Sequence, residues 1–135
     1  VSTFEPFLSG FGDAPNTTLK RFCLLCSQGS DEPRALASLL LAGAPNAQPD
    51  ALSAGLELLG RLDTRAALQR FNGPQLHLFA GLDALVPEQA ASDVLALLPD
   101  VEVGLIEQAC HAFLLEAPHE LAAAIQAFLH ESGDE

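Results

Sequence analysis

Apolar residues recur every three or four positions along the first half of the chain, which is the spacing of helices that pack by one face. The pattern predicts helices over residues 17–28, 32–43, 49–62 and 63–71, each bounded by proline, glycine or small polar residues. A stretch with proline, glycine and asparagine at 42–49 predicts a loop. No part of this half shows the signals of a strand. The first half is therefore expected to be helical.

The second half has a different rhythm, in which short apolar runs alternate with helical patterns. Strands are predicted over 75–81 and 101–107, and helices over 87–99 and 117–132. This order predicts a right-handed crossover between two parallel strands, and therefore an α/β fold. Because parallel sheets are covered on both faces and rarely stop at two strands, we expect this pair to be an edge of a larger sheet.

Charge is distributed unevenly along the 135 residues, which carry a net charge of −12. Residues 1–71 hold all six basic residues and seven of the 18 acidic ones, whereas residues 72–135 hold the other eleven acids and no base. An acidic surface repels phosphate backbones, and no run approaches the roughly 18 apolar residues of a membrane helix. We expect neither nucleic acid nor a membrane as a partner, and the change in charge indicates two structural parts.

The chain has three cysteines, Cys23, Cys26 and Cys110. A small, odd number argues against a disulfide framework and favours a reducing compartment, the cytoplasm. The motif CLLC has the CxxC spacing of redox and zinc sites, but zinc needs more ligands and no second pair exists. We expect Cys23 and Cys26 to be buried on a helix as small apolar residues, with no metal or cofactor.

A lone carboxylate and a lone histidine follow the two predicted strands. Asp83 comes just after 75–81 and His111 just after 101–107. In parallel sheets both loops open at the same edge, where a carboxylate can hold one imidazole nitrogen and leave the other as a general base. Taken singly, each residue has a simpler, non-catalytic explanation. Asp83 would be a loop or capping residue, and His111 would be a histidine packed on an apolar turn. Their matching positions favour the catalytic interpretation.

Three stretches carry a resemblance to a known family, LSAGLELLGRLDTRAALQ, PQLHLFAGLDALVP and QACHAFLLEAPHEL. They resemble BioH-like pimeloyl-[acyl-carrier protein] methyl ester esterases of the α/β-hydrolase superfamily, in which the acid and the histidine also follow the last two strands. LKRFCLLCSQGS and PRALASLLLA are similar to the helical lid of that family. The resemblance, from about residue 17 to about 130, implies a helical lid over 1–71. It implies the C-terminal part of the α/β-hydrolase core over 72–135, with the last two parallel strands and their helices.

The resemblance also implies roles for particular residues. Asp83 would be the acid and His111 the base of a serine esterase that releases methanol from pimeloyl-acyl-carrier protein methyl ester in biotin biosynthesis. Arg21 and Arg34 fall on lid arginines that contact the acyl-carrier protein. The segment that lines the acyl pocket falls on Phe22, Cys23, Leu24, Leu25 and Cys26.

The chain departs from the family in ways that bear on activity. Cys110 stands where related hydrolases usually have glycine, and Phe113 where BioH-like chains have proline. No G-x-S-x-G motif for a nucleophilic serine is present, and neither is an oxyanion loop. We therefore expect a C-terminal fragment that begins inside the lid, lacks the N-terminal half of the fold and is inactive by itself.

Two other interpretations remain open at this level. The parent could be another α/β-hydrolase, such as a haloperoxidase-like enzyme or a C–C bond hydrolase. The chain could also be a non-catalytic module that binds acyl chains or proteins. An upstream reading frame that encodes G-x-S-x-G would support the fragment, and a start codon at Val1 would support the binding module.

Overall fold

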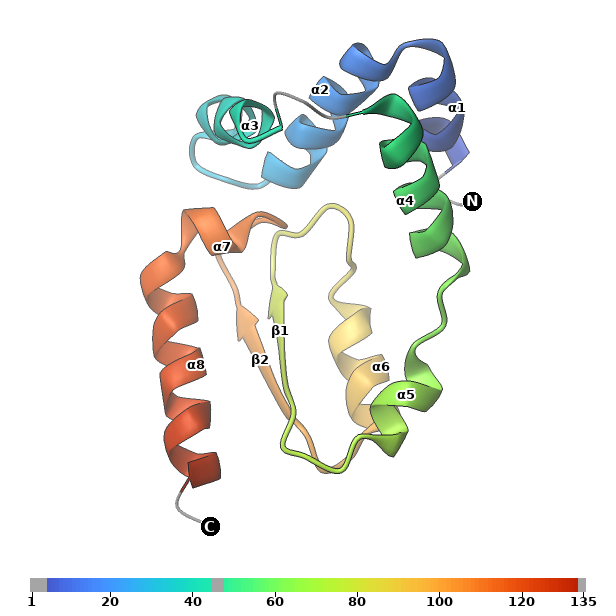
Figure 1. Ribbon diagram of the computed structural model, residues 1–135. Helices are drawn as coiled ribbons and strands as arrows, with labels where there is room; N and C mark the ends of the chain where they lie inside the picture. The colour runs from blue at the N-terminus through green and yellow to red at the C-terminus, as the bar shows by residue number, and fades with distance from the viewer. Residues whose placement is uncertain (1–4, 45–47, 134–135) are drawn as a thin grey trace.

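The computed structural model describes residues 5–44 and 48–133 (Figure 1). The helices before the first strand are α1 (Glu5–Asp13), α2 (Pro15–Ser27), α3 (Pro33–Ala42), α4 (Pro49–Arg61) and α5 (Arg65–Arg70). The elements that follow are β1 (Leu76–Ala80), α6 (Gln89–Leu97), β2 (Glu102–Ile106), α7 (Phe113–Glu116) and α8 (Pro118–Gly133). None of the helices in this described part is long and apolar enough to cross a bilayer.

The helices and strands predicted from the periodicity all occur, with ends shifted by one or two residues. Helix α2 begins at Pro15 because proline is well suited to the first helical position. Two helices were not predicted. Helix α1 contains Gly10 and Gly12, which are poor helix formers, and α7 is a single turn too short to show a period. Residues 45–47 of the predicted loop lie outside the described residues.

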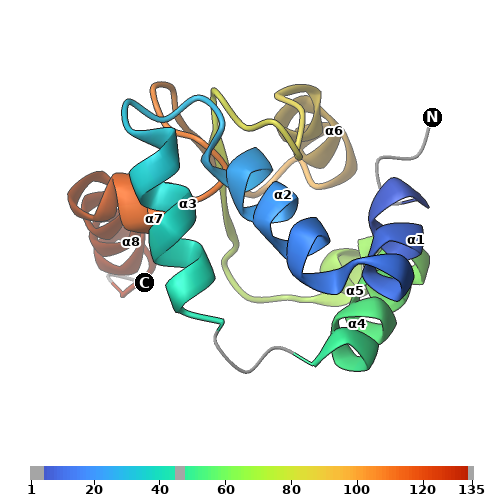
Figure 2. The ribbon, with the colours of Figure 1, turned by 90° about the horizontal axis from the view of Figure 1, so that it is seen from above.

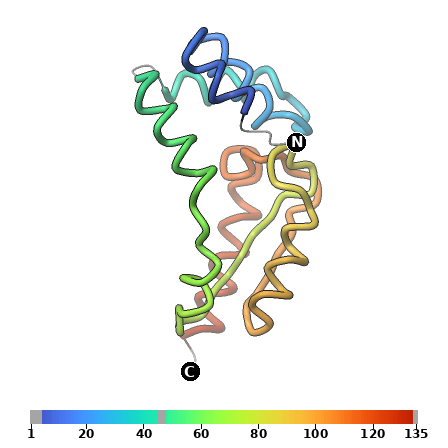
Figure 3. The backbone as a smooth tube through the Cα atoms, turned by 90° about the vertical axis from the view of Figure 1, so that its right-hand side faces the viewer, coloured from blue at the N-terminus to red at the C-terminus, as the bar shows by residue number. Residues whose placement is uncertain are grey.

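The two strands form a parallel pair, as predicted. Their register runs from Leu76 opposite Glu102 to Ala80 opposite Ile106, and α6 makes the crossover between them. The sheet has two strands in the described part of the chain. Helices α6 and α8 flank this pair, and α2 and α3 extend across the carboxyl ends of the strands (Figures 1 and 2). Figure 3 shows the same arrangement from the side, with α4 descending from the helical layer toward α5.

The best-buried apolar residues gather around the loop that follows β2. One cluster joins α3 to this loop through Leu36, Cys110 and Ala112, with Leu40 packed against it. A second cluster joins the strand ends to α7 and α8, and contains Ala80, Ile106 and Ala109 with Phe113, Ala117 and Leu121. The core therefore holds the segment on both sides of His111 in place.

Candidate active site

The ends of the two strands approach each other closely at Gly81. Its N–H donates a hydrogen bond to the carbonyl of Ile106 at 3.0 Å. A Cβ atom at this position would overlap the backbone of Glu107. Only glycine lets the backbones come this close, and the loops after the strands therefore leave the sheet side by side.

Asp83 lies in the loop after β1, with its carboxylate held by the backbone. Its Oδ1 atom accepts hydrogen bonds from the N–H groups of Leu85 at 2.8 Å and Val86 at 2.9 Å. The side chain is only 6% exposed. Aspartate commonly closes a turn in this way, and here the two N–H groups fix the direction of the carboxylate.

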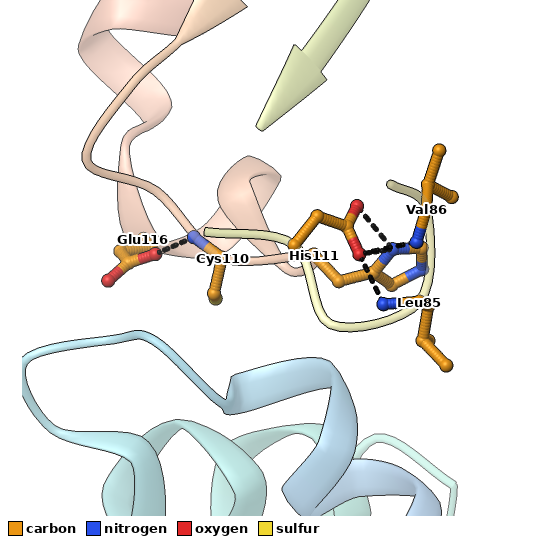
Figure 4. Close-up of polar contacts among 6 residues, drawn as sticks. Leu85, Val86, Cys110, His111 and Glu116 are labelled. Atoms are coloured by element: carbon orange, nitrogen blue, oxygen red, sulfur yellow. Dashed lines mark hydrogen bonds and ion pairs between the residues drawn. The ribbon is translucent and has the colours of Figure 1, made fainter. Parts of the chain in front are cut away.

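His111 pairs with this carboxylate through Nδ1. The Nδ1 atom lies 2.8 Å from Oδ2 and 3.0 Å from Oδ1 of Asp83 (Figure 4). An ionised carboxylate only accepts hydrogen bonds, so Nδ1 carries the proton and Nε2 is the nitrogen that can take one. The ring is 36% exposed, which leaves it accessible to a reacting group. The pair has the arrangement of a general base oriented by an acid.

The α2–α3 region contacts both loops of the pair. Ala112, next to His111, donates its N–H to the carbonyl of Cys26 near the end of α2 at 3.1 Å. Gly29 has a φ of 97°, and a Cβ there would lie 2.8 Å from the Cβ and the carbonyl oxygen of Leu82, beside Asp83. The turn after α2 therefore needs glycine both for its backbone conformation and for this close approach.

All three cysteines are buried and free, as predicted for Cys23 and Cys26. Burial, and then the neighbouring Cys23 and Asp83, raise the pKa of Cys26 to about 11. Burial, and then a hydrogen bond with Glu116, raise the pKa of Cys110 to about 11. The thiolate is the reactive form of cysteine, so neither side chain is a nucleophile near neutral pH.

The structure divides the expected acyl-binding segment between the interior and the surface. Cys23 and Cys26 are buried, whereas Leu24 is 48% exposed. Phe22 is half-buried and packs edge-to-face on Phe7, with ring centroids 5.6 Å apart. The segment therefore presents only part of its length to a ligand.

A shallow groove of about 430 Å³ lies between α2 and α3. Leu24 is among its apolar lining residues, and Lys20 and Arg34 are its basic ones. Arg21 is exposed on α2, and Arg34 is exposed in the first turn of α3. Sequence reasoning missed Lys20, although its position four residues before Leu24 places both on one face of a helix.

Other hollows and groupings offer less to this chemistry. A hollow of about 790 Å³ is lined by residues at the opposite ends of the strands, Gln75 and Glu102 among them. Among residues 5–44 and 48–133, no group of three or more histidine, cysteine or acidic side chains is placed to hold a metal ion. The Asp83–His111 pair is therefore the candidate for acid–base catalysis in the described part of the chain.

Sequence comparison finds relatives whose names state an enzymatic activity or a pathway. No family model matches the chain. It is 37% identical over 132 residues to the biotin biosynthesis bifunctional protein BioHC of Teredinibacter turnerae, across 96% of this chain and 23% of that protein. The pimeloyl-[acyl-carrier protein] methyl ester esterases of Aromatoleum aromaticum and Photobacterium profundum are 35% and 34% identical. Each match covers 93% of this chain, with 52% and 50% of the two esterases.

A solved structure shows which fold these elements belong to. The bromoperoxidase from Bacillus anthracis superposes with a TM-score of 0.84 at 23% identity, across 95% of this chain and 48% of that one. At this identity the likeness establishes the fold alone. The chain spans about half the length of the esterases it matches and about a quarter of the bifunctional proteins. It thus has the fold of the C-terminal part of an α/β-hydrolase and is similar along nearly its whole length to the pimeloyl-[acyl-carrier protein] methyl ester esterases.

Proposed function

We propose that this chain supplies the acid and the base of a serine carboxylesterase that hydrolyses pimeloyl-acyl-carrier protein methyl ester. The observation that carries the proposal is the Nδ1 contact of His111 with Asp83, 2.8 Å long, at the carboxyl ends of parallel strands. The curated relatives include enzymes named for hydrolysis of this ester. In open α/β sheets, reacting groups gather at this edge.

In this proposal the nucleophile is a serine on the N-terminal half of the fold. The Nε2 atom of His111 takes the serine proton as the oxygen attacks the ester carbonyl, and Asp83 stabilises the imidazolium that forms. His111 then returns the proton to the methoxide, which leaves as methanol. A water molecule, deprotonated by the same nitrogen, attacks the acyl-enzyme. The imidazolium returns that proton to the serine oxygen as the acyl–oxygen bond breaks, which gives the free acid and the regenerated serine.

We further propose that residues 1–71 act as a lid and residues 72–135 as core. The groove between α2 and α3 adjoins the segment that includes Cys23 and Leu24, where an acyl chain would lie. The bases Arg21 and Arg34 are exposed on these helices in a chain whose net charge is −12. Exposed cations of this kind suit an acidic carrier protein, because complementary charge guides association.

The proposal is tested by completing the fold. The N-terminal half of the Aromatoleum aromaticum esterase is fused to this chain, and the product is called the joined protein below. It is incubated with pimeloyl-acyl-carrier protein methyl ester, and release of the free acid is followed by mass spectrometry. We expect turnover by the joined protein and none by either part alone, because an unassisted His–Asp pair cannot form an acyl-enzyme.

Two outcomes of this experiment would contradict the proposal. One is a folded, soluble joined protein that leaves the ester intact. The other is ester hydrolysis by the 135-residue chain alone that a serine-directed inhibitor abolishes, since this would place the nucleophile within the chain itself.

A further inference from the structure

We propose that Glu116 is a positioning residue that holds the loop carrying His111 against the turn between α2 and α3. The inference rests on the proposed function, because it matters for catalysis only if His111 is the base. Glu116 ends the single turn of α7 and is half-buried. Its carboxylate acts through the backbone beside His111.

One contact of Glu116 fixes the residue that precedes the histidine. Its Oε2 atom accepts a hydrogen bond from the N–H of Cys110 at 2.8 Å. In Figure 4, Glu116 lies on one side of Cys110, and His111 lies on the other. Hydrogen bonds to an ionised carboxylate are about twice as strong as those between neutral groups. The peptide unit that joins Ala109 to Cys110, one residue before His111, is thereby held in place.

The residue after the histidine is held from another element. The N–H of Ala112 donates to the carbonyl of Cys26 at 3.1 Å, and the side chains of Cys110 and Ala112 pack with Leu36 of α3. His111 therefore stands between two anchored peptide units. Of the two hydrogen bonds, only the one from Cys110 is accepted by a side chain, so a substitution at Glu116 removes it directly.

Glu116 also faces the α2–α3 turn, because it lines a hollow of about 240 Å³ together with Ser30 and Glu32 of that turn. Partial burial acts to raise the pKa of Glu116, but hydrogen bonds from the backbone and thiol of Cys110, the hydroxyl of Ser30 and the backbone of Asp31 lower it below its ordinary value. Glu116 therefore stays ionised near neutral pH. Ser30 and Asp31 lie between α2 and α3, so one charged group connects the proposed lid, α7 and the histidine loop.

Substitutions at Glu116 separate these contacts. Glu116→Ala removes the acceptor of the Cys110 N–H and the carboxylate that faces Ser30. Glu116→Gln keeps one oxygen that can accept from Cys110 but loses the second acceptor. Ser30→Ala changes the lid side alone, where it also removes the hydrogen bond from the N–H of Glu32 to the Ser30 hydroxyl. Glu120→Gln, at an exposed glutamate in the first turn of α8, is the matched control for loss of one negative charge.

The kinetic test uses the joined protein and a small soluble ester such as p-nitrophenyl acetate. We expect Glu116→Ala to lower kcat by roughly tenfold to a hundredfold with little change in KM, because a displaced base affects the chemical step rather than binding. Glu116→Gln should fall between Glu116→Ala and the parent. Glu120→Gln should match the parent.

A spectroscopic test is independent of turnover. The ring Nδ1–H of His111 is recorded by ¹H–¹⁵N NMR on the joined protein and on the 135-residue chain, with Asp83→Asn as the reference for a lost partner. We expect the parent signal to shift or broaden in Glu116→Ala and to remain in Glu120→Gln. If the joined parent does not hydrolyse esters, the proposed function fails while this signal still tests Glu116. A Glu116→Ala protein with an unchanged Nδ1–H signal and an unchanged kcat, whatever its stability, would overturn the inference.

Discussion

Gly81 and Glu107 lie so close that a single methyl group on the glycine would overlap the glutamate backbone. This approach brings together the ends of β1 and β2, and with them the loops that carry Asp83 and His111. The contact between Asp83 and His111 thus depends on the absence of a side chain at position 81.

Gly81→Ala should therefore both destabilise the protein and separate the pair. Forcing extra volume into a packed site costs roughly 1–3 kcal/mol of the free energy of unfolding, which denaturant titration measures. Gly55→Ala is the matched control, because that glycine lies within α4 with open space around it, and it should stabilise by about 0.5–1 kcal/mol. If Gly81→Ala left both the stability of the chain and the activity of the joined protein unchanged, the close approach of Gly81 to Glu107 would be shown to be unimportant.

Asp83→Asn should reduce catalysis while leaving the loop intact. The asparagine oxygen can still accept from the N–H groups of Leu85 and Val86, so the turn should persist. The ring would lose the acceptor for Nδ1–H and with it the tautomer that leaves Nε2 free. In serine proteases the equivalent change lowers kcat by about 10⁴, and we expect a loss of that order in the joined protein. Activity within tenfold of the parent would argue against Asp83 as the acid.

Much of this site could be predicted from the sequence because its signals are local. The strands have apolar runs of the right length, and Asp83 and His111 each follow one of them, so the topology alone places them at one edge. Glu116 could not be found in this way, since its neighbours are Cys110 in the loop before α7 and Ser30 far away in the sequence. The approach of Gly29 to Leu82 is equally a product of tertiary packing.

Arg34→Ala should weaken the use of a carrier-bound ester and spare a small one. We expect kcat/KM for pimeloyl-acyl-carrier protein methyl ester to fall by about two- to fivefold, the effect of one exposed charge. The loss should shrink at high salt, because salt screens exposed charges. Arg21→Ala should behave similarly, and Arg70→Ala, on α5 and away from the groove, is the control. Equal losses on both esters would contradict a role in carrier recognition.

The buried thiols should make the chain less stable in alkali. Burial is the first cause that raises the pKa of both Cys26 and Cys110 to about 11, from an ordinary value near 9. Between these values the folded chain keeps protons that the unfolded chain releases, so the stabilising contribution is complete below about pH 9 and is lost as pH rises toward 11. The chain has no tyrosine and one lysine, so few other groups titrate in this range.

Urea unfolding under reducing conditions at pH 8 and pH 10.5 measures this loss. We expect the midpoint to fall with pH in the parent, and to fall less in the double variant Cys26→Ala with Cys110→Ala. Equal pH dependence in the two proteins would show that the thiols do not carry the effect.

The most direct test of the proposed function is the kcat of His111→Ala in the joined protein, measured on pimeloyl-acyl-carrier protein methyl ester. Without its base the serine hydroxyl is a weak nucleophile, and we predict a fall in kcat on the order of 10⁴ or more, with the fold unchanged by circular dichroism. His119→Ala, at an exposed histidine in the first turn of α8, should keep the parent rate. A His111→Ala protein that hydrolyses the ester within tenfold of the parent rate would contradict the assignment of His111 as the catalytic base.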